Sequence, residues 1–270
     1  MKSIFRMHRI SKINSMKKIL IGLITLLITS AQVIAQKDIK HFIFFDLERD
    51  RIHDTSFLNN AHIAGAQLKY MWRELEPEKN IYNLELIQND LDFLASKGKK
   101  LFIQLQDVTF DTIWAKPVPD YIATEKRYHG GVNIPYETNE NDEIIKMDGY
   151  VARRWDNQVA ERFNKLLTAM GERFDGKIEG INLPETAISF GETGKLYPEG
   201  FTPEIYRDAI IKYMSTAKNA FPHSIVIQYA NFMPGEWLPW TDKSYLQSLF
   251  KFAVENGIGM GGPDIQRVPL

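Results

Sequence analysis

The sequence predicts an α/β fold in which a parallel β-sheet is covered by amphipathic helices. Six short apolar runs alternate along the chain with stretches of helical periodicity. Near-continuous apolar runs are typical of parallel strands, because both faces of such a sheet are buried. The six predicted strands are Phe42–Phe45, Gln67–Met71, Leu101–Leu105, Ile178–Ile181, Ile225–Tyr229 and Ile258–Met260.

The helices between these runs carry their own start and stop signals. Thr202 before Pro203 is typical of an N-cap followed by proline at the first helical position. We expect Asn83 to cap an earlier helix, and Gly98 and Gly257 to follow helix ends. The predicted helices are Leu84–Leu94, Val159–Met170, Tyr206–Ala217, Leu246–Val254 and a weaker one within Thr55–Ala64.

Two architectures fit this alternation, a doubly wound open sheet and a TIM-type (β/α)8 barrel. A doubly wound sheet is expected to carry a glycine-rich turn after its first strand, and Asp46–Asp50 contains no glycine. Polar and aromatic residues instead follow the carboxyl ends of nearly all strands, the edge at which barrel active sites are built. The barrel is therefore favoured. With about six βα units it is predicted to be incomplete.

One long segment, residues 107–155, separates the third strand from the next helix. It is rich in Pro, Gly, Asn and Asp and is interpreted as a loop excursion above the barrel mouth. Two further strands hidden in Asp107–Asp156 would complete the barrel; the alternative, which we favour, is that the chain is an incomplete barrel. The predicted domain spans residues 36–270.

The amino terminus has the layout of a secretory signal peptide. Lys17 and Lys18 precede the apolar run Ile19–Ile28, and Val33 and Ala35 form a small-residue cleavage site. Residues 1–35 are predicted to be removed, with Met16 a possible true start. An uncleaved anchor is the alternative, but the run is shorter than the roughly 20 residues of a spanning helix. We expect an exported protein, periplasmic or secreted, without stable membrane insertion after cleavage.

Composition excludes several classes of function. Six of the 33 basic residues fall in the first 35, which leaves 27 against 34 acidic residues and gives no support for nucleic-acid binding. The chain contains no cysteine, which excludes disulfides, thiolate metal sites and a cysteine nucleophile. The six histidines form no pair at metal-ligand spacing, so neither a metal nor another cofactor is predicted. The oligomeric state is not predicted.

A motif after the second strand resembles the barrel glycoside hydrolases of the large retaining clan. Its matching residues are Trp72, Glu76-Pro77, Asn80 and Tyr82. The resemblance is weaker but continues through Ile178–Glu185 and Gln228–Asn231, covering roughly residues 40–264. It implies a glycosidase-like barrel and a carbohydrate ligand, and it identifies the superfamily without assigning a family.

The resemblance implies a catalytic role for a carboxylate after the fourth strand. In the clan this strand ends in an adjacent Asn-Glu pair, whose Glu is the acid/base, whereas here two residues separate Asn182 from Glu185. A carboxyl group in a dry barrel mouth can have its pKa raised enough to protonate a leaving oxygen. Glu185 is therefore the first candidate and Glu192 the second. The alternative is that Glu185 only caps or ion-pairs its loop.

Hydrolysis also needs a second carboxylate. The clan takes its nucleophile from the seventh strand, beyond the six units predicted. The carboxylates that follow strands here match none of the family's nucleophiles: Asp46, Glu48, Asp107, Glu236 and Asp264.

Aromatic, amide and basic residues gathered at strand ends suit a carbohydrate, because aromatic rings stack on sugar faces and amides bond hydroxyls. Two functions follow. One is an exported glycoside hydrolase that acts on an oligo- or polysaccharide through Glu185. The other is a non-catalytic carbohydrate-binding homologue, or an inactive fragment of a longer glycosidase. The predicted substrate-binding residues are Arg49, Trp72, Arg73, Gln104, Gln106, Asn182, Gln228, Asn231, Trp237 and Asp264.

Overall fold

The computed structural model describes residues 39–46, 48–113, 115–139 and 141–262. The predicted signal peptide and Asp264 lie outside these residues. A compact unit begins at His41.

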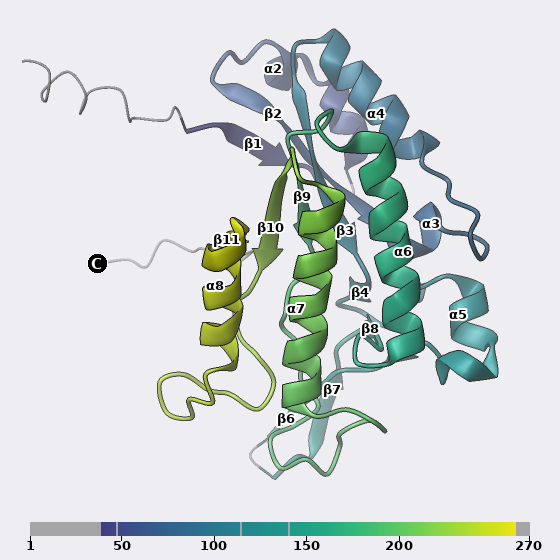
Figure 1. Ribbon diagram of the computed structural model, residues 1–270, viewed down its shortest axis with the longest axis vertical. Coiled ribbons are helices and arrows are strands. Elements are labelled where there is room, and N and C mark those ends of the chain that lie inside the picture. Colours follow the sequence, from purple (N-terminus) through teal and green to yellow (C-terminus); the bar gives the residue numbers. More distant parts are fainter. Residues whose placement is uncertain (1–38, 47, 114, 140, 263–270) are drawn as a thin grey trace, which may run out of the picture. The chain divides into compact units, whose positions relative to one another are not determined.

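A sheet of parallel strands forms the centre of this unit (Figure 1). Its spatial order follows the chain order, as in a barrel, whereas the strand order reverses in a doubly wound sheet. All six predicted strands are confirmed, and within the described residues no strand pairs with the outer edge of the first or the last. The sheet is thus an open part of a barrel. Its strands are β1 (His41–Phe44), β2 (Ile63–Met71), β3 (Lys100–Gln106), β9 (Gly180–Leu183), β10 (Ile225–Tyr229) and β11 (Gly259–Gly261).

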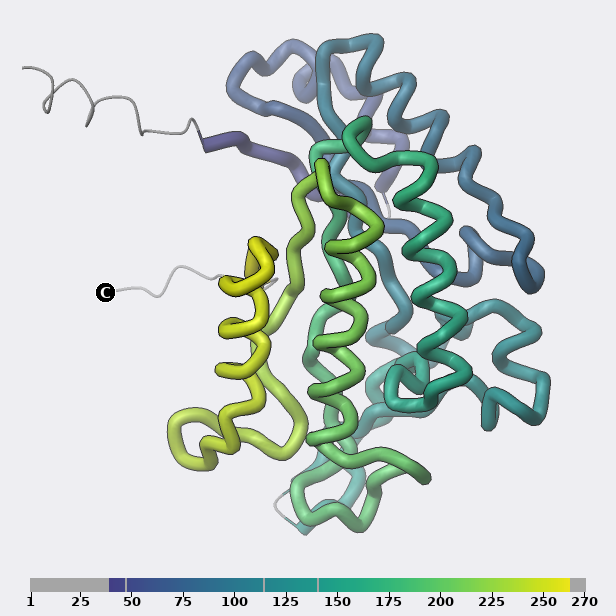
Figure 2. The backbone as a smooth tube through the Cα atoms, viewed as in Figure 1, coloured from purple at the N-terminus to yellow at the C-terminus, as the bar shows by residue number. Residues whose placement is uncertain are grey.

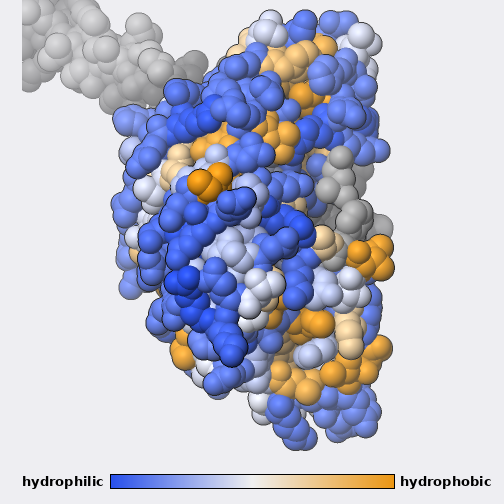
Figure 3. Space-filling model, turned by 90° about the vertical axis from the view of Figure 1, so that its right-hand side faces the viewer, coloured by the Kyte–Doolittle hydropathy of each residue, from blue (hydrophilic) through white to orange (hydrophobic). Residues whose placement is uncertain are grey.

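Four long helices lie side by side over one face of the sheet, and Figure 2 traces the chain from each helix into the next strand. Their apolar stripes are buried against the strands, as predicted. The side of the unit seen in Figure 3 is mostly hydrophilic, with apolar side chains in separate small groups. No helix in the described part of the chain is long and apolar enough to cross a membrane. The helices are α4 (Glu85–Ser96), α6 (Asn157–Phe174), α7 (Pro203–Ala220) and α8 (Tyr245–Asn256).

The helix ends confirm most of the predicted signals. The Thr202 hydroxyl accepts a hydrogen bond from the backbone N–H of Ile205 (3.2 Å) at the start of α7. The N-cap of α4 is Leu84. The prediction of Asn83 was wrong by one residue, because the first helical hydrogen bond runs from the Gln88 N–H to the Leu84 carbonyl (3.1 Å).

The weaker helix predicted within Thr55–Ala64 is a single turn, α2 (Thr55–Leu58). Ile63 and Ala64 instead open β2, where pairing with β1 satisfies their backbone. Short elements flank these regions: η1 (Arg49–His53) and α3 (Trp72–Leu75).

The segment between β3 and α6 forms two small antiparallel sheets, β4-β8-β5 and β6-β7. Because none of these strands joins the six-stranded sheet, the alternative that this segment holds the two remaining barrel strands is wrong. The segment also contains two short helices. Its elements are β4 (Val108–Thr109), α5 (Asp120–Thr124), η2 (Lys126–Tyr128), β5 (Val132–Asn133), β6 (Tyr136–Thr138), β7 (Ile144–Met147) and β8 (Tyr150–Ala152).

The face of the sheet opposite the helices, called the inner face here, changes character along the strands. Side chains alternate between the faces, so Ile103 packs into the helix-side core while Phe102 and Gln104 lie on the inner face. The Phe42 and Phe102 rings meet edge to face at 5.6 Å. A Cβ atom at Gly180 would lie only 2.7 Å from the Phe102 ring. Aromatic rings thus fill the amino-terminal part of the inner face, and polar side chains lie towards the carboxyl ends.

Candidate functional site

The carboxyl ends of the strands surround a cavity of about 310 Å³, called the mouth cavity here. It contains three predicted site residues, Gln104 and Gln106 from β3 and Glu185 from the loop after β9. Aromatic rings and one lysine complete its wall. The lining residues are Phe44, Lys69, Gln104, Gln106, Phe110, Glu185 and Tyr229.

Three amide side chains on the inner face have unsatisfied oxygens. Gln104, Gln106 and Asn182 are 6%, 3% and 0% exposed. The Oε1 atoms of the two glutamines and Oδ1 of Asn182 accept no hydrogen bond from the described residues. Gln104 and Asn182 are paired across β3 and β9, so two of these oxygens come from neighbouring strands. A buried acceptor without a donor costs about 1–3 kcal/mol, and such a group in a native protein calls for a specific explanation.

The charge of Lys69 is compensated within the site. Its Nζ forms an ion pair with Asp46 and lies 5.7 Å from the centre of the Phe44 ring. Across the inner face, Gln67 Nε2 donates to the Tyr229 hydroxyl (3.1 Å) and so joins β2 to β10. The cavity wall therefore combines neutral amides and aromatic rings with a lysine that already has its counter-ion.

A fully buried arginine holds the main chain of Glu185. Arg154, at the end of the excursion, donates to the Glu185 carbonyl (2.7 Å), to the Tyr206 hydroxyl (2.6 Å) and, through Nε, to Asp107 (2.9 Å). Burial raises the pKa of Tyr206 to about 12. Glu185 itself is 8% exposed. Nothing in the sequence marks Arg154 for this role, because its partners are distant along the chain.

Asp46 pairs with Lys69 of the cavity wall, and three other carboxylates named from the sequence are engaged elsewhere. Asp107 is paired with Arg154, and Glu48 with Arg51 (2.8 Å). Glu236 accepts from the backbone N–H of Tyr245 (2.7 Å) and so caps α8. Among the described residues that line the mouth cavity, Glu185 is the one carboxylate.

The sequence motif around Trp72 forms a buried network of hydrogen bonds and an ion pair on the helix side of the sheet. The Trp72 ring is fully buried, packs on Phe163 at 5.1 Å and donates to Glu76 (3.0 Å). Glu76 forms an ion pair with Arg162, whose Nη1 also donates to Asn80 (2.8 Å). The structure thus places the predicted substrate-binding residue Trp72 away from the mouth cavity.

Three more predicted binding residues form hydrogen bonds with main-chain oxygens of the protein. Arg49 donates to the main-chain oxygen of Lys69 (2.9 Å). Arg73 donates to that of Lys116 (3.1 Å). Gln228 is buried, and its amide donates to the main-chain oxygen of Pro184 (2.6 Å). None of the three lines the mouth cavity.

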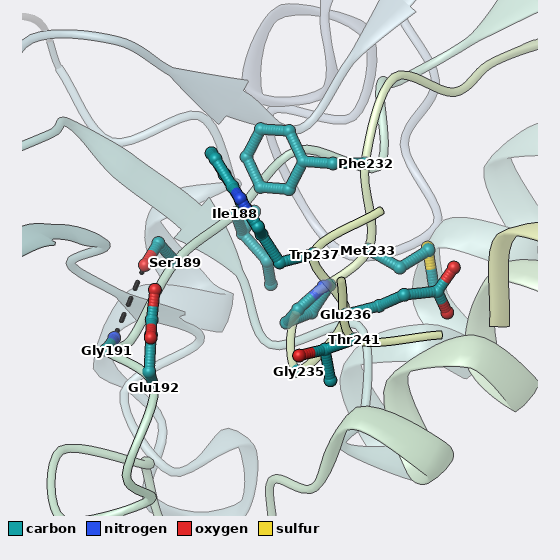
Figure 4. A pocket seen from close by; sticks show the side chains of 11 residues that line it. Ile188, Ser189, Gly191, Glu192, Phe232, Met233, Gly235, Glu236, Trp237 and Thr241 are labelled. Carbon is teal, nitrogen blue, oxygen red and sulfur yellow. Dashed lines mark hydrogen bonds between the residues drawn. The ribbon is translucent and has the colours of Figure 1, made fainter. Parts of the chain in front are cut away.

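The loops after β9 and β10 form a second hollow of about 280 Å³, called the loop groove here (Figure 4). Two predicted residues, Glu192 and Trp237, line it. Asn231 lines an adjoining hollow together with Trp237. Figure 4 shows Trp237 and Phe232 on one side of the groove, Ser189 and Glu192 on the other.

Asp142 fixes one wall of this groove. Its carboxylate accepts hydrogen bonds from the backbone N–H groups of Glu192 (2.7 Å) and Thr193 (2.9 Å) and from the Thr193 hydroxyl. These hydrogen bonds, that of the Thr193 hydroxyl above all, hold the pKa of Asp142 below its usual value.

The lowered pKa predicts a pH-dependent stability. The ionised Asp142 stabilises the fold fully above the unfolded pKa of about 3.9, and this contribution is lost as the pH falls through the lower folded value. We expect Asp142→Asn to unfold at a lower urea concentration than the wild type at neutral pH. The gap should shrink below about pH 4. The urea unfolding midpoints of both proteins across this pH range test the prediction. A difference between the two midpoints that does not change with pH would contradict it.

Within the described part of the chain, no group of three or more His, Asp or Glu side chains is placed to hold a metal ion.

Parallel strands in chain order, alternating with helices on one face, decide the architecture. The fold is a partial TIM barrel. No family model and no curated protein matches this chain. Solved structures of xylanases and of a β-galactosidase are similar to part of it at low sequence identity.

Three of these structures illustrate the likeness. An endoxylanase retrieved from a sugarcane soil metagenome is 12% identical with a TM-score of 0.47, over 83% of this chain and 56% of its own. Xylanase 10B from Thermotoga petrophila is 13% identical with a TM-score of 0.48, over 83% and 59%. A β-galactosidase from Marinomonas ef1 is 11% identical with a TM-score of 0.49, over 78% and 39%. The chain therefore matches little more than half the length of the two xylanases.

Proposed function

We propose that the protein binds carbohydrate in its mouth cavity. The observation that carries this proposal is a set of buried amide oxygens that accept no hydrogen bond from the described residues. Two of them, on Gln104 and Gln106, belong to the cavity wall, and the third, on Asn182, lies on the neighbouring strand, paired with Gln104. Each needs a donor. A sugar supplies several, because every hydroxyl both donates and accepts.

The remaining wall suits a neutral ligand with apolar ring faces. Phe44, Phe110 and Tyr229 provide aromatic surface on which the C–H face of a sugar ring can stack. Lys69 is already paired with Asp46, which argues against an anion as the ligand. A few polar groups within a largely aromatic hollow are typical of small-ligand sites.

Replacing Gln104 with methionine is expected to weaken carbohydrate binding without lowering the stability of the fold. Because its oxygen is buried without a donor, we expect Gln104→Met to be as stable as the wild type or more stable, by up to about 1 kcal/mol. We also expect it to bind oligosaccharides at least tenfold more weakly, about 1.4 kcal/mol. Urea unfolding gives the first quantity. Isothermal titration with cello-, xylo-, manno- and galacto-oligosaccharides gives the second.

Two matched variants control this experiment. Gln228 is equally buried but donates two hydrogen bonds, so Gln228→Met should lose about 1–3 kcal/mol of stability. Gln158 is exposed on α6, and Gln158→Met should change neither stability nor binding. Wild-type affinity in Gln104→Met would overturn the proposal.

Glycoside hydrolysis with Glu185 as general acid is the second candidate function. It is favoured by the position of this buried carboxyl group in the cavity wall, beside aromatic rings. Hydrolysis also needs a carboxylate about 5 Å away for retention, or further for inversion. The described lining of the cavity contains no second one, so binding is the primary proposal. If turnover is found, Glu185→Gln should abolish it and preserve binding.

A further inference from the structure

Two tryptophans in the loop after β10 display their rings to solvent. Trp237 and Trp240 are 61% and 76% exposed. Their ring centroids lie 6.4 Å apart with the ring planes only 19° from parallel, and this exposed pair of indoles is called the platform here. Tryptophan is highly buried on average, and grouped exposed apolar side chains commonly mark a binding surface.

The loop that carries this platform is held in place. The backbone groups of Trp237 and Thr241 bond to each other in both directions (2.9 and 2.8 Å). Glu236 anchors the same loop by capping α8 through Tyr245. Figure 4 shows the Glu236 carboxylate directed away from the groove. The backbone that carries the platform is therefore held in place without a ligand, which reduces the entropy lost on binding.

The loop groove beside the platform has one apolar and one polar wall. Trp237 and Phe232 face Ser189 and Glu192 across it (Figure 4). The Glu192 side chain is exposed and forms no ion pair or hydrogen bond with another described residue. A sugar ring matches both walls, because its C–H face stacks on indole while its hydroxyls donate to a carboxylate. An apolar helix would leave Glu192 desolvated and unpaired.

The groove and the mouth cavity are lined by residues of the same two loops. Glu185 and Tyr229 line the mouth cavity. Ile188 and Phe232, each three residues further along the same loops, line the groove. One extended ligand lying along these loops can therefore occupy both the mouth cavity and the loop groove.

We propose that the loop groove, with the Trp237–Trp240 platform, is an outer binding site for the same carbohydrate chain whose end occupies the mouth cavity. The ligand is accordingly an oligosaccharide or polysaccharide of several units, and a single sugar fills only the inner site. This inference rests on the proposed function.

The dependence of affinity on chain length tests the inference. The probe is the best-bound series of the oligosaccharide panel, titrated from the disaccharide to the hexasaccharide. In the wild type we expect affinity to rise at least tenfold over this range. Trp237→Ala and Trp240→Ala should each remove most of the rise while leaving disaccharide affinity unchanged. Trp237→Phe, which keeps an aromatic face, should retain much of it.

The control is Phe250→Ala, which removes an exposed aromatic ring from α8, away from the groove, and should change nothing. Near-UV circular dichroism establishes that each variant is folded. If the rise with chain length survives in both alanine variants, or is absent from the wild type, the outer site is wrong while the proposed function stands. If no member of the panel binds at all, both the outer site and the proposed function are wrong.

Discussion

Replacing Asp107 with alanine is expected to lower the free energy of unfolding by about 3–5 kcal/mol. The Asp107–Arg154 pair is fully buried, and the alanine variant leaves the guanidinium in the interior without its counter-ion. Arg154 also holds the Glu185 carbonyl and the Tyr206 hydroxyl, so the loop that carries Glu185 loses its anchor as well. Urea unfolding of the wild type and Asp107→Ala measures the loss.

A matched exposed pair provides the comparison. Glu161 and Lys165 are one helical turn apart on α6, and both side chains are largely exposed. Exposed pairs of this kind contribute little to stability, so Glu161→Ala should leave the free energy of unfolding close to that of the wild type. A similarly small loss of unfolding free energy in Asp107→Ala would show that the buried Asp107–Arg154 pair does not stabilise the loops around the mouth cavity.

The second large effect is expected for Glu76→Ala, again a loss of about 3–5 kcal/mol. Glu76 is fully buried, is paired with Arg162 and accepts from Trp72 and from the backbone of Asn80. The variant leaves all of these donors unpaired behind the sheet. Because the network lies away from the mouth cavity, the affinity of the folded variant for oligosaccharide should not change.

Urea unfolding followed by titration of the folded variant checks both expectations. Glu78 is two residues away and exposed, and Glu78→Ala should stay within about 0.5 kcal/mol of the wild type. A stable Glu76→Ala with lost affinity would instead assign this motif to binding.

The fold could be predicted from the sequence because its signals are local. The run Ile225–Tyr229 became β10 with the same bounds, and the Thr202-Pro203 cap opens α7. The prediction of about six βα units also follows from the number of such apolar runs. The antiparallel strands of the excursion carry no apolar run of comparable strength, since several of their side chains are exposed, and periodicity therefore does not reveal them.

The site was predictable only in part, because strand-end residues alternate between faces. Gln104 and Gln106, polar positions within an apolar strand, do line the mouth cavity, and their role in binding stays a prediction. Trp72 directly follows β2 and points into the helix layer, since a shift of one residue along a strand moves a side chain to the opposite face. The Asp107–Arg154 pair joins residues 47 apart, and a single sequence carries no signal for such a contact.

The most direct test of the central claim is a crystal structure of the protein soaked with the best-bound oligosaccharide. The account predicts a sugar ring in the mouth cavity with hydroxyl oxygens at hydrogen-bonding distance, about 2.7–3.0 Å, from Oε1 of Gln104 and Gln106. A sugar bound elsewhere on the surface, with the mouth cavity left to solvent, would contradict it.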